Sequence, residues 1–132
     1  MAMTIVQMQR VLLLVMTLGL PPIALSYGLM PEVSLPLLYD IDASGVNTRH
    51  VFRAVAGLYL AMVALWFLGA QRPSLRLPAL WSLFVFTLGI GLGRLVSLVA
   101  DGWPHPLLAG YMVLEFALAA ITWQLIQRNP SS

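Results

Sequence analysis

Two charged side chains interrupt long apolar stretches of this sequence: Arg94 and Glu115. An ionised group near the centre of a bilayer costs on the order of 3 kcal/mol, so such groups normally face the protein interior and pair. If the apolar stretches cross a membrane, both residues lie about two helical turns below the same boundary. The spacing therefore predicts an ion pair between Arg94 and Glu115, with Arg53 in the same leaflet.

Polar residues at helical spacing extend this prediction. Ser97 and Asp101 share a helix face with Arg94, and Tyr111 shares one with Glu115. Arg53, His50 and Asp101 fall near the outer boundary of the same leaflet. We therefore predict one buried polar cluster, structural or ligand-binding, made of Arg53, Arg94, Glu115, Asp101, His50, Tyr111 and Ser97.

Three roles are open for this cluster. In the first, which we favour, the Arg94–Glu115 pair clamps two helices and the other members complete the network. In the second, the cluster is a polar pocket entered from the outer leaflet, where Arg53 or Arg94 binds a quinone carbonyl, a lipid phosphate or a small carboxylate. A proton path is the weakest, because one buried acid without a second carboxylate along the span makes a poor relay.

Several other chemistries are excluded or disfavoured. Without cysteine the chain has no disulfide, thiolate nucleophile or iron–sulfur ligand. His50 and His105 are both expected at the outer surface, so they should not share a haem, and with Asp101 they form only a minimal metal set. We predict no metal site, no catalytic residues and no cofactor of the chain's own. Scattered single arginines and a net charge of +2 give no nucleic-acid surface.

Four apolar segments must position the cluster, at about residues 11–29, 51–70, 78–100 and 107–126. Each is about 20 residues long, which as a helix spans the hydrocarbon thickness of a bilayer. Only 9% of the residues are charged, far below an ordinary soluble domain. We predict an all-α integral membrane protein, one domain over residues 1–132, with four transmembrane helices in an antiparallel bundle. For the first segment, a cleaved signal peptide is the competing interpretation.

Flanking arginines predict the orientation of these helices. Short loops rich in arginine stay cytoplasmic, and Arg10, Arg72, Arg76 and Arg128 fall on one side, with Arg49 alone on the other. We expect both termini in the cytoplasm of a bacterium and the helices in its inner membrane. Aromatic residues near the helix ends suggest belts at the two boundaries. They are Trp66, Trp81 and Trp123 on the cytoplasmic side, and Tyr27, Tyr39 and Trp103 on the other.

Small residues and the first connector complete the picture. Small side chains let helix backbones approach closely, which predicts packing at Gly57, Ala61, Gly89 and Gly93. The connector over residues 31–48 contains "VSLPLLY", which is apolar enough to lie along the membrane surface. Asn47 or Thr48 is expected to cap the second long helix.

The motifs "NTRHVFRAVAGLYLAM" and "GRLVSLVADGWP", with the acidic residue in "YMVLEFALA", carry a family resemblance. They resemble a bacterial family of small four-helix membrane proteins of unknown function, distantly similar to the DoxX/DoxD-like membrane proteins. The likeness extends over about residues 28–128. It implies a four-helix bundle whose polar residues gather in the outer half. Some DoxD-like relatives are membrane subunits of quinone-linked oxidoreductases, so the resemblance adds to the quinone alternative.

The short loops leave the helix surfaces as the main area for partners. We predict a non-enzymatic accessory or assembly subunit packed against a larger bacterial membrane complex, with other membrane-protein subunits and lipids as partners. A homo-oligomer is compatible with this prediction. The alternative is a quinone-, lipid- or small-ligand-binding membrane protein that uses an outer-leaflet Arg/Glu pocket. A transporter ranks last, because no inverted repeat or broken helix pair is evident.

Overall fold

The computed structural model describes residues 2–130, and five helices account for most of them. Four of these helices are long and apolar enough to cross a membrane: α1 (Ile5–Gly28), α3 (Val46–Gln71), α4 (Pro73–Asp101) and α5 (Pro106–Gln127). They contain the four predicted apolar segments except Leu29, which caps α1, and this confirms the all-helical class and indicates a multi-pass membrane protein. The remaining helix, α2 (Pro31–Tyr39), is too short to span a bilayer.

Hydrogen-bonding residues set the helix ends beyond the apolar segments. Thr4 begins α1 with a capping box, because its hydroxyl accepts from the Gln7 amide at 3.1 Å and its own amide donates to the Gln7 side chain at 2.9 Å. Pro106 begins α5, a position that suits proline because the first amide of a helix has no intrahelical partner. Helix α4 starts at Pro73, so the turn after α3 is reduced to Arg72.

The predicted cap of the second long helix is wrong. Asn47 and Thr48 lie inside α3, whose N-cap is Gly45 without a side-chain hydrogen bond. Arg49 donates back to the Ser44 carbonyl at 3.4 Å, so polar residues continue the helix past its apolar part. Hydropathy marks where a helix leaves the hydrocarbon layer, whereas backbone hydrogen bonding marks where it ends.

Part of the connector forms α2, which ends at Asp40 in the left-handed conformation at φ 58°. Pro31, Leu35 and Tyr39 are spaced four apart and are all buried, so this face of α2 packs against the protein. The Ser34 hydroxyl donates to the Ser26 carbonyl and holds α2 against the end of α1.

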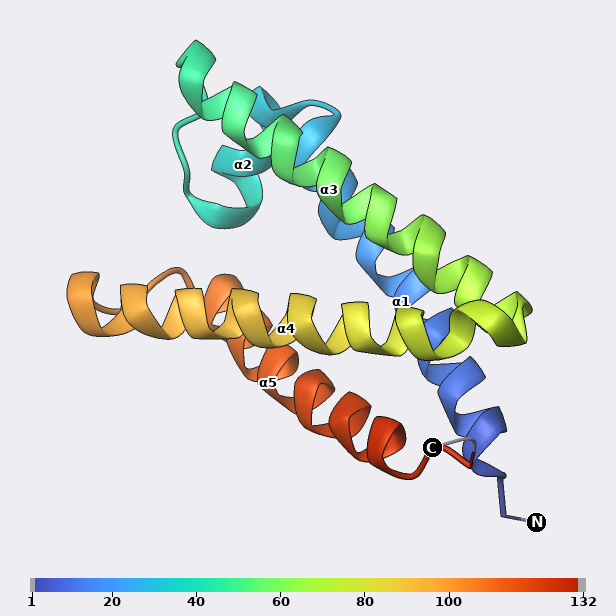
Figure 1. Cartoon of the computed structure of the whole chain (residues 1–132). Coiled ribbons are helices and arrows are strands. Elements are labelled where there is room, and N and C mark those ends of the chain that lie inside the picture. Colours follow the sequence, from blue (N-terminus) through green and yellow to red (C-terminus); the bar gives the residue numbers. More distant parts are fainter. Residues whose placement is uncertain (1, 131–132) are drawn as a thin grey trace.

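The long helices are arranged as two pairs (Figure 1). Helix α1 lies along α3, and α4 lies along α5. The pairs meet near Arg72, which we call the turn end, and separate towards α2, which we call the divergent end. The four helices therefore enclose more space at one end than at the other.

Close packing fills the turn end. The Trp66 side chain is fully buried and its indole N–H donates to the Ser82 hydroxyl at 3.1 Å. Gly69 lies so close to α4 that an added Cβ would overlap the Cβ of Ala79. Gln9 is also fully buried, and its amide donates to the Leu125 carbonyl at 3.1 Å. These contacts join α1, α3, α4 and α5 at this end.

The predicted packing residues are all exposed within this chain. An added Cβ would meet no neighbouring atom within 4 Å at any of the glycines in that set. The side of each helix that carries these residues is exposed, so they do not pack within this chain. The set is Gly57, Ala61, Gly89 and Gly93.

Other glycines bring helices together instead. Gly28 lies against Ala56, and Gly91 lies under the Phe116 ring, whose nearest atoms would be 3.3 Å from an added Cβ. Spacing alone shows which small residues share a face. It cannot tell whether that face meets a helix of the same chain.

Three of the six residues predicted for the aromatic belts do not lie at the protein surface. Trp66, Tyr27 and Tyr39 are buried in the protein interior, whereas Trp81, Trp103 and Trp123 are exposed, as a belt requires. A ring near a helix end fits a membrane boundary or a protein core equally well, and only the helix rotation distinguishes the two.

Candidate functional site

The Arg94–Glu115 pair joins α4 to α5 within the apolar part of both helices. The Arg94 Nε donates to both carboxylate oxygens of Glu115, at 2.9 and 3.1 Å. The side chains are only 22% and 14% exposed, so the protein shields both charges from the lipid. The charges that the sequence pairs are thus in direct contact.

The Tyr111 ring packs against the Arg94 guanidinium. The Arg94 Cζ lies 5.7 Å from the centre of the Tyr111 ring, within the range of a cation–π contact. The Tyr111 hydroxyl is 3.0 Å from that of Tyr39, which is in turn 2.8 Å from the Ser26 hydroxyl. This chain of hydroxyls connects α5, α2 and α1 to the ion pair.

All four tyrosines of the chain meet in this region. Ring centres lie 5.6 Å apart for Tyr27 and Tyr39, 5.8 Å for Tyr27 and Tyr59, and 6.0 Å for Tyr39 and Tyr111. The sequence predicts only Tyr111 as part of the site. The other three were missed because each tyrosine lies on a different helix, so no spacing along the chain connects them.

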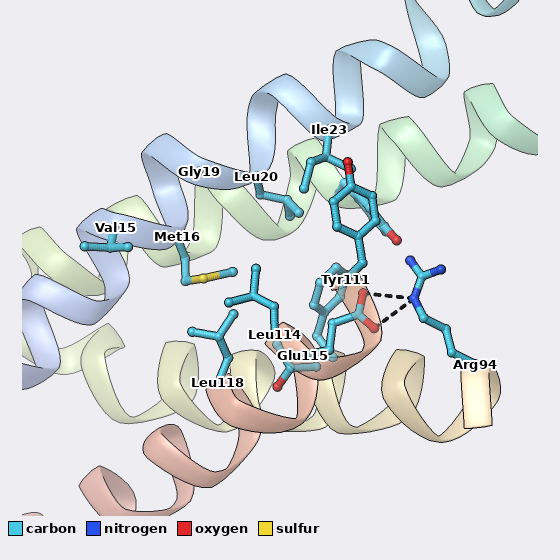
Figure 2. A pocket seen from close by; sticks show the side chains of 13 residues that line it. Val15, Met16, Gly19, Leu20, Ile23, Arg94, Tyr111, Leu114, Glu115 and Leu118 are labelled. Carbon is cyan, nitrogen blue, oxygen red and sulfur yellow. Dashed lines mark hydrogen bonds and ion pairs between the residues drawn. The ribbon is translucent and has the colours of Figure 1, made fainter. Parts of the chain in front are cut away.

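A cavity of about 170 Å³ opens beside the ion pair, lined by residues of α1, α3, α4 and α5. Figure 2 shows Val15, Met16 and Leu118 around its apolar end and Arg94 at the other. The two terminal nitrogens of Arg94 point away from the Glu115 carboxylate. The cavity thus combines an apolar wall with one strong group of hydrogen-bond donors.

The rim of this cavity lies between α1 and α5. Val15, Gly19 and Leu114 line the cavity and are also exposed on the molecular surface. Exposed apolar residues at the middle of membrane-crossing helices face lipid tails. The cavity is therefore open to the side, between exposed apolar residues of α1 and α5.

The rest of the predicted cluster does not join this site. Arg53 is exposed and its Nε donates to the Gly28 carbonyl at 3.2 Å, which ties α3 to the end of α1. Arg53 does not line the cavity, and its helix α3 follows α1 and separates from α4 at the divergent end (Figure 1). The predicted network is therefore corrected to Arg94, Glu115 and Tyr111.

The remaining predicted members have partners of their own or lie at the surface. Asp101 accepts from the Ser97 hydroxyl at 2.9 Å, and both residues are exposed. His50 is exposed beside Arg53 in a shallow surface groove. His105 accepts from the Leu107 amide at 3.1 Å and so caps α5. Within residues 2–130, no three His, Asp or Glu side chains are grouped to hold a metal ion.

Fold and site together define a multi-pass helical membrane protein with a lateral apolar cavity that ends at a buried ion pair. The chain belongs to the family described as Domain of unknown function (DUF4345), which matches residues 8–126. No curated protein and no solved structure matches it. Membership agrees with the predicted family of unknown function, and the more distant likeness to DoxX/DoxD proteins stays a prediction.

Proposed function

We propose that this protein binds an amphiphilic small molecule within the membrane. An oxygen-bearing head group would meet Arg94, and the apolar remainder would leave the cavity between α1 and α5. The observation that carries the proposal is an apolar cavity of about 170 Å³ with a guanidinium at its end. Apolar pockets with a few convergent polar groups are the usual form of small-molecule sites.

The size of the cavity limits what enters it. A cavity of about 150 Å³ admits a benzene ring, whereas pockets for whole drug-sized ligands measure about 300 to 1,000 Å³. Only one ring, or a short length of chain, would therefore be enclosed here. A lateral opening lets the rest of the molecule stay among the lipid tails.

The geometry of the ion pair favours binding over a purely structural clamp. Arginine has five N–H donors, and strong structural pairs with carboxylates commonly use two nitrogens in parallel. Here Nε alone makes both bonds to Glu115. Among residues 2–130, Glu115 is the hydrogen-bond partner of this guanidinium, so the terminal nitrogens are left for other acceptors.

The proposal also states which membrane holds the protein and how its helices are oriented there. We place the protein in the bacterial inner membrane, with antiparallel spanning helices and both termini in the cytoplasm. The excess of arginine at the turn end and at the termini supports this orientation. The ligand would then enter from the outer leaflet, and a quinone is the first ligand to test.

Gly19→Leu tests the proposal directly. Gly19 lines the cavity, and no atom lies within 4 Å of an added Cβ, so the larger side chain should fill the cavity rim without disturbing α1. Gly57→Leu is the matched control, because Gly57 is equally open but does not line the cavity. We expect decylubiquinone to raise the thermal unfolding temperature of the wild type and of the control, but not of Gly19→Leu. Equal stabilisation of all three proteins would overturn the proposal.

An accessory subunit is the second candidate. On α4, Gly89 and Gly93 are four residues apart, are exposed and have open space around them, as a face for a partner helix would require. If this function holds, the protein co-purifies with other membrane subunits in mild detergent, and Gly89→Leu releases them. A monodisperse monomer from the native membrane would count against it.

A further inference from the structure

We propose that the cavity selects an uncharged carbonyl head group and excludes carboxylates and phosphates, and that the Tyr59 hydroxyl holds this carbonyl together with Arg94. This inference rests on the proposed function, because it names the class of ligand that the same cavity takes. Two features of the site carry it: the hydrogen-bonding state of Tyr59 and the charge balance of the ion pair.

Tyr59 of α3 supplies a donor that the protein does not use. The residue is 6% exposed and lines the cavity, with its ring held edge-on against Phe86 at 5.1 Å between centres. Among residues 2–130, no group makes a hydrogen bond to the Tyr59 hydroxyl, whereas the Tyr111 hydroxyl, on the same cavity, is bonded to Tyr39. The hydroxyl therefore keeps a free donor at an apolar cavity, where a ligand acceptor would gain a hydrogen bond with little competition from water.

The ion pair decides the charge of that acceptor. Arg94 and Glu115 are the charged residues that line the cavity, and their formal charges cancel. An anionic head group would bring a second negative charge into a shielded, low-dielectric site. It would either face Glu115 or displace it from Arg94, and both arrangements leave a buried charge without its partner. A neutral carbonyl needs only donors, which Tyr59 and the terminal nitrogens of Arg94 provide.

A neutral carbonyl can come from a quinone ring or from an acyl ester. Both place a hydrogen-bond acceptor next to apolar atoms, and both have a tail that can leave through the lateral opening. The binding experiment therefore includes a probe for each source.

The test compares three probes by their binding to the detergent-solubilised full chain. Methyl decanoate and decanoate have the same acyl chain and differ in charge, and decylubiquinone represents the quinone source. We expect at least one neutral probe to bind about tenfold or more tightly than decanoate. Whichever neutral probe binds better identifies the source of the carbonyl.

Tyr59→Phe tests the second half of the proposal. Loss of one hydrogen bond should weaken binding of the neutral probe about fivefold to tenfold. Thr122→Val is the control, because it also removes a buried hydroxyl but Thr122 does not line the cavity. The unfolding temperature of each variant without ligand shows whether the variant is folded. The ratio of the wild-type affinities for methyl decanoate and decanoate tests the charge selectivity without any variant.

The outcomes separate this inference from the proposed function. Decanoate binding as tightly as the neutral probes, with Gly19→Leu still blocking both, overturns the inference and keeps the cavity as a binding site. Unchanged binding in Tyr59→Phe overturns the role of Tyr59. Failure of every probe to bind the wild type overturns the proposed function and this inference with it.

Discussion

The turn end and the divergent end of this protein are built in different ways. At the turn end, Trp66, Leu80 and Leu83 are buried, and Gly69 brings α3 against α4. At the divergent end the helix pairs separate (Figure 1). There, Tyr39 of α2 contacts the rings of Tyr27 and Tyr111. The comparison indicates that tight packing holds the pairs together at one end, and that the separation at the other makes room for the cavity beside Arg94.

The difference has a physical basis in the membrane. Lipid tails are as apolar as leucine, so helices associate there through close van der Waals packing and hydrogen bonds. Close packing requires small residues at the point of contact, such as Gly69 and Ala79. A site for a ligand requires the opposite, and the cavity beside Arg94 occurs where the helices have separated.

The largest effect is expected from Trp66→Ala, which removes the central side chain of the turn end. Trp66 is fully buried and its indole N–H donates to Ser82, so the change leaves a large void and removes this hydrogen bond between α3 and α4. We expect a loss of about 3 to 5 kcal/mol in unfolding free energy, measured by denaturant titration in detergent. The exposed Trp103 provides the control, since Trp103→Ala should change little. Similar losses in both variants would show that the turn end is not the more tightly packed region.

Glu115→Gln asks how far the divergent end also depends on its ion pair. The change leaves Arg94 shielded from water without a counter-charge, and we expect a loss of about 2 to 3 kcal/mol, less than for a fully buried pair because both side chains are partly exposed. The double variant Arg94→Gln with Glu115→Gln removes the lone charge and should recover much of this loss. A double variant less stable than Glu115→Gln would contradict this account.

Two alanine substitutions compare the ends at matched positions. Gly69→Ala places a Cβ against Ala79 and near the Leu75 carbonyl, so it should cost about 1 to 2 kcal/mol of stability. Gly19→Ala meets no neighbour and should stabilise α1 by up to about 1 kcal/mol, because alanine favours helix over glycine. The thermal unfolding temperatures of the two variants test both expectations. Adding Ala79→Gly to Gly69→Ala should restore much of the lost stability, because it removes the Cβ that the new side chain meets. Equal shifts of the same sign would remove the contrast between the ends.

The smallest effect concerns the loop at the divergent end. The Asp42 carboxylate accepts from the Ser44 amide at 3.0 Å, and this bond lowers the pKa of Asp42 below its ordinary value. A lowered pKa means that the contribution to stability is present at neutral pH and is lost as pH falls through the folded-state value. Hydrogen exchange at the Ser44 amide should therefore become faster on acidification in the wild type, after correction for intrinsic rates. In Asp42→Asn this additional acceleration should be absent.

Much of the fold could be predicted from residue type alone. Length and hydropathy locate the four long helices, because crossing the hydrocarbon layer requires about 20 apolar residues. The cost of a charge in that layer likewise predicts that Arg94 and Glu115 meet. Prediction failed where it depended on helix rotation, as at Gly57 and Gly93, which have the right spacing for packing but are exposed.

The sequence by itself determined that the chain is a helical membrane protein and that its deepest charges pair, because both follow from the free energy of transfer into lipid. Only the tertiary structure decided that Arg53 leaves the site, that Tyr59 enters it and that a cavity separates the helix pairs. The reason is that these features depend on how each helix is rotated and tilted against its neighbours. Rotation and tilt arise from side-chain packing between helices far apart in the chain, which leaves no local pattern in the sequence.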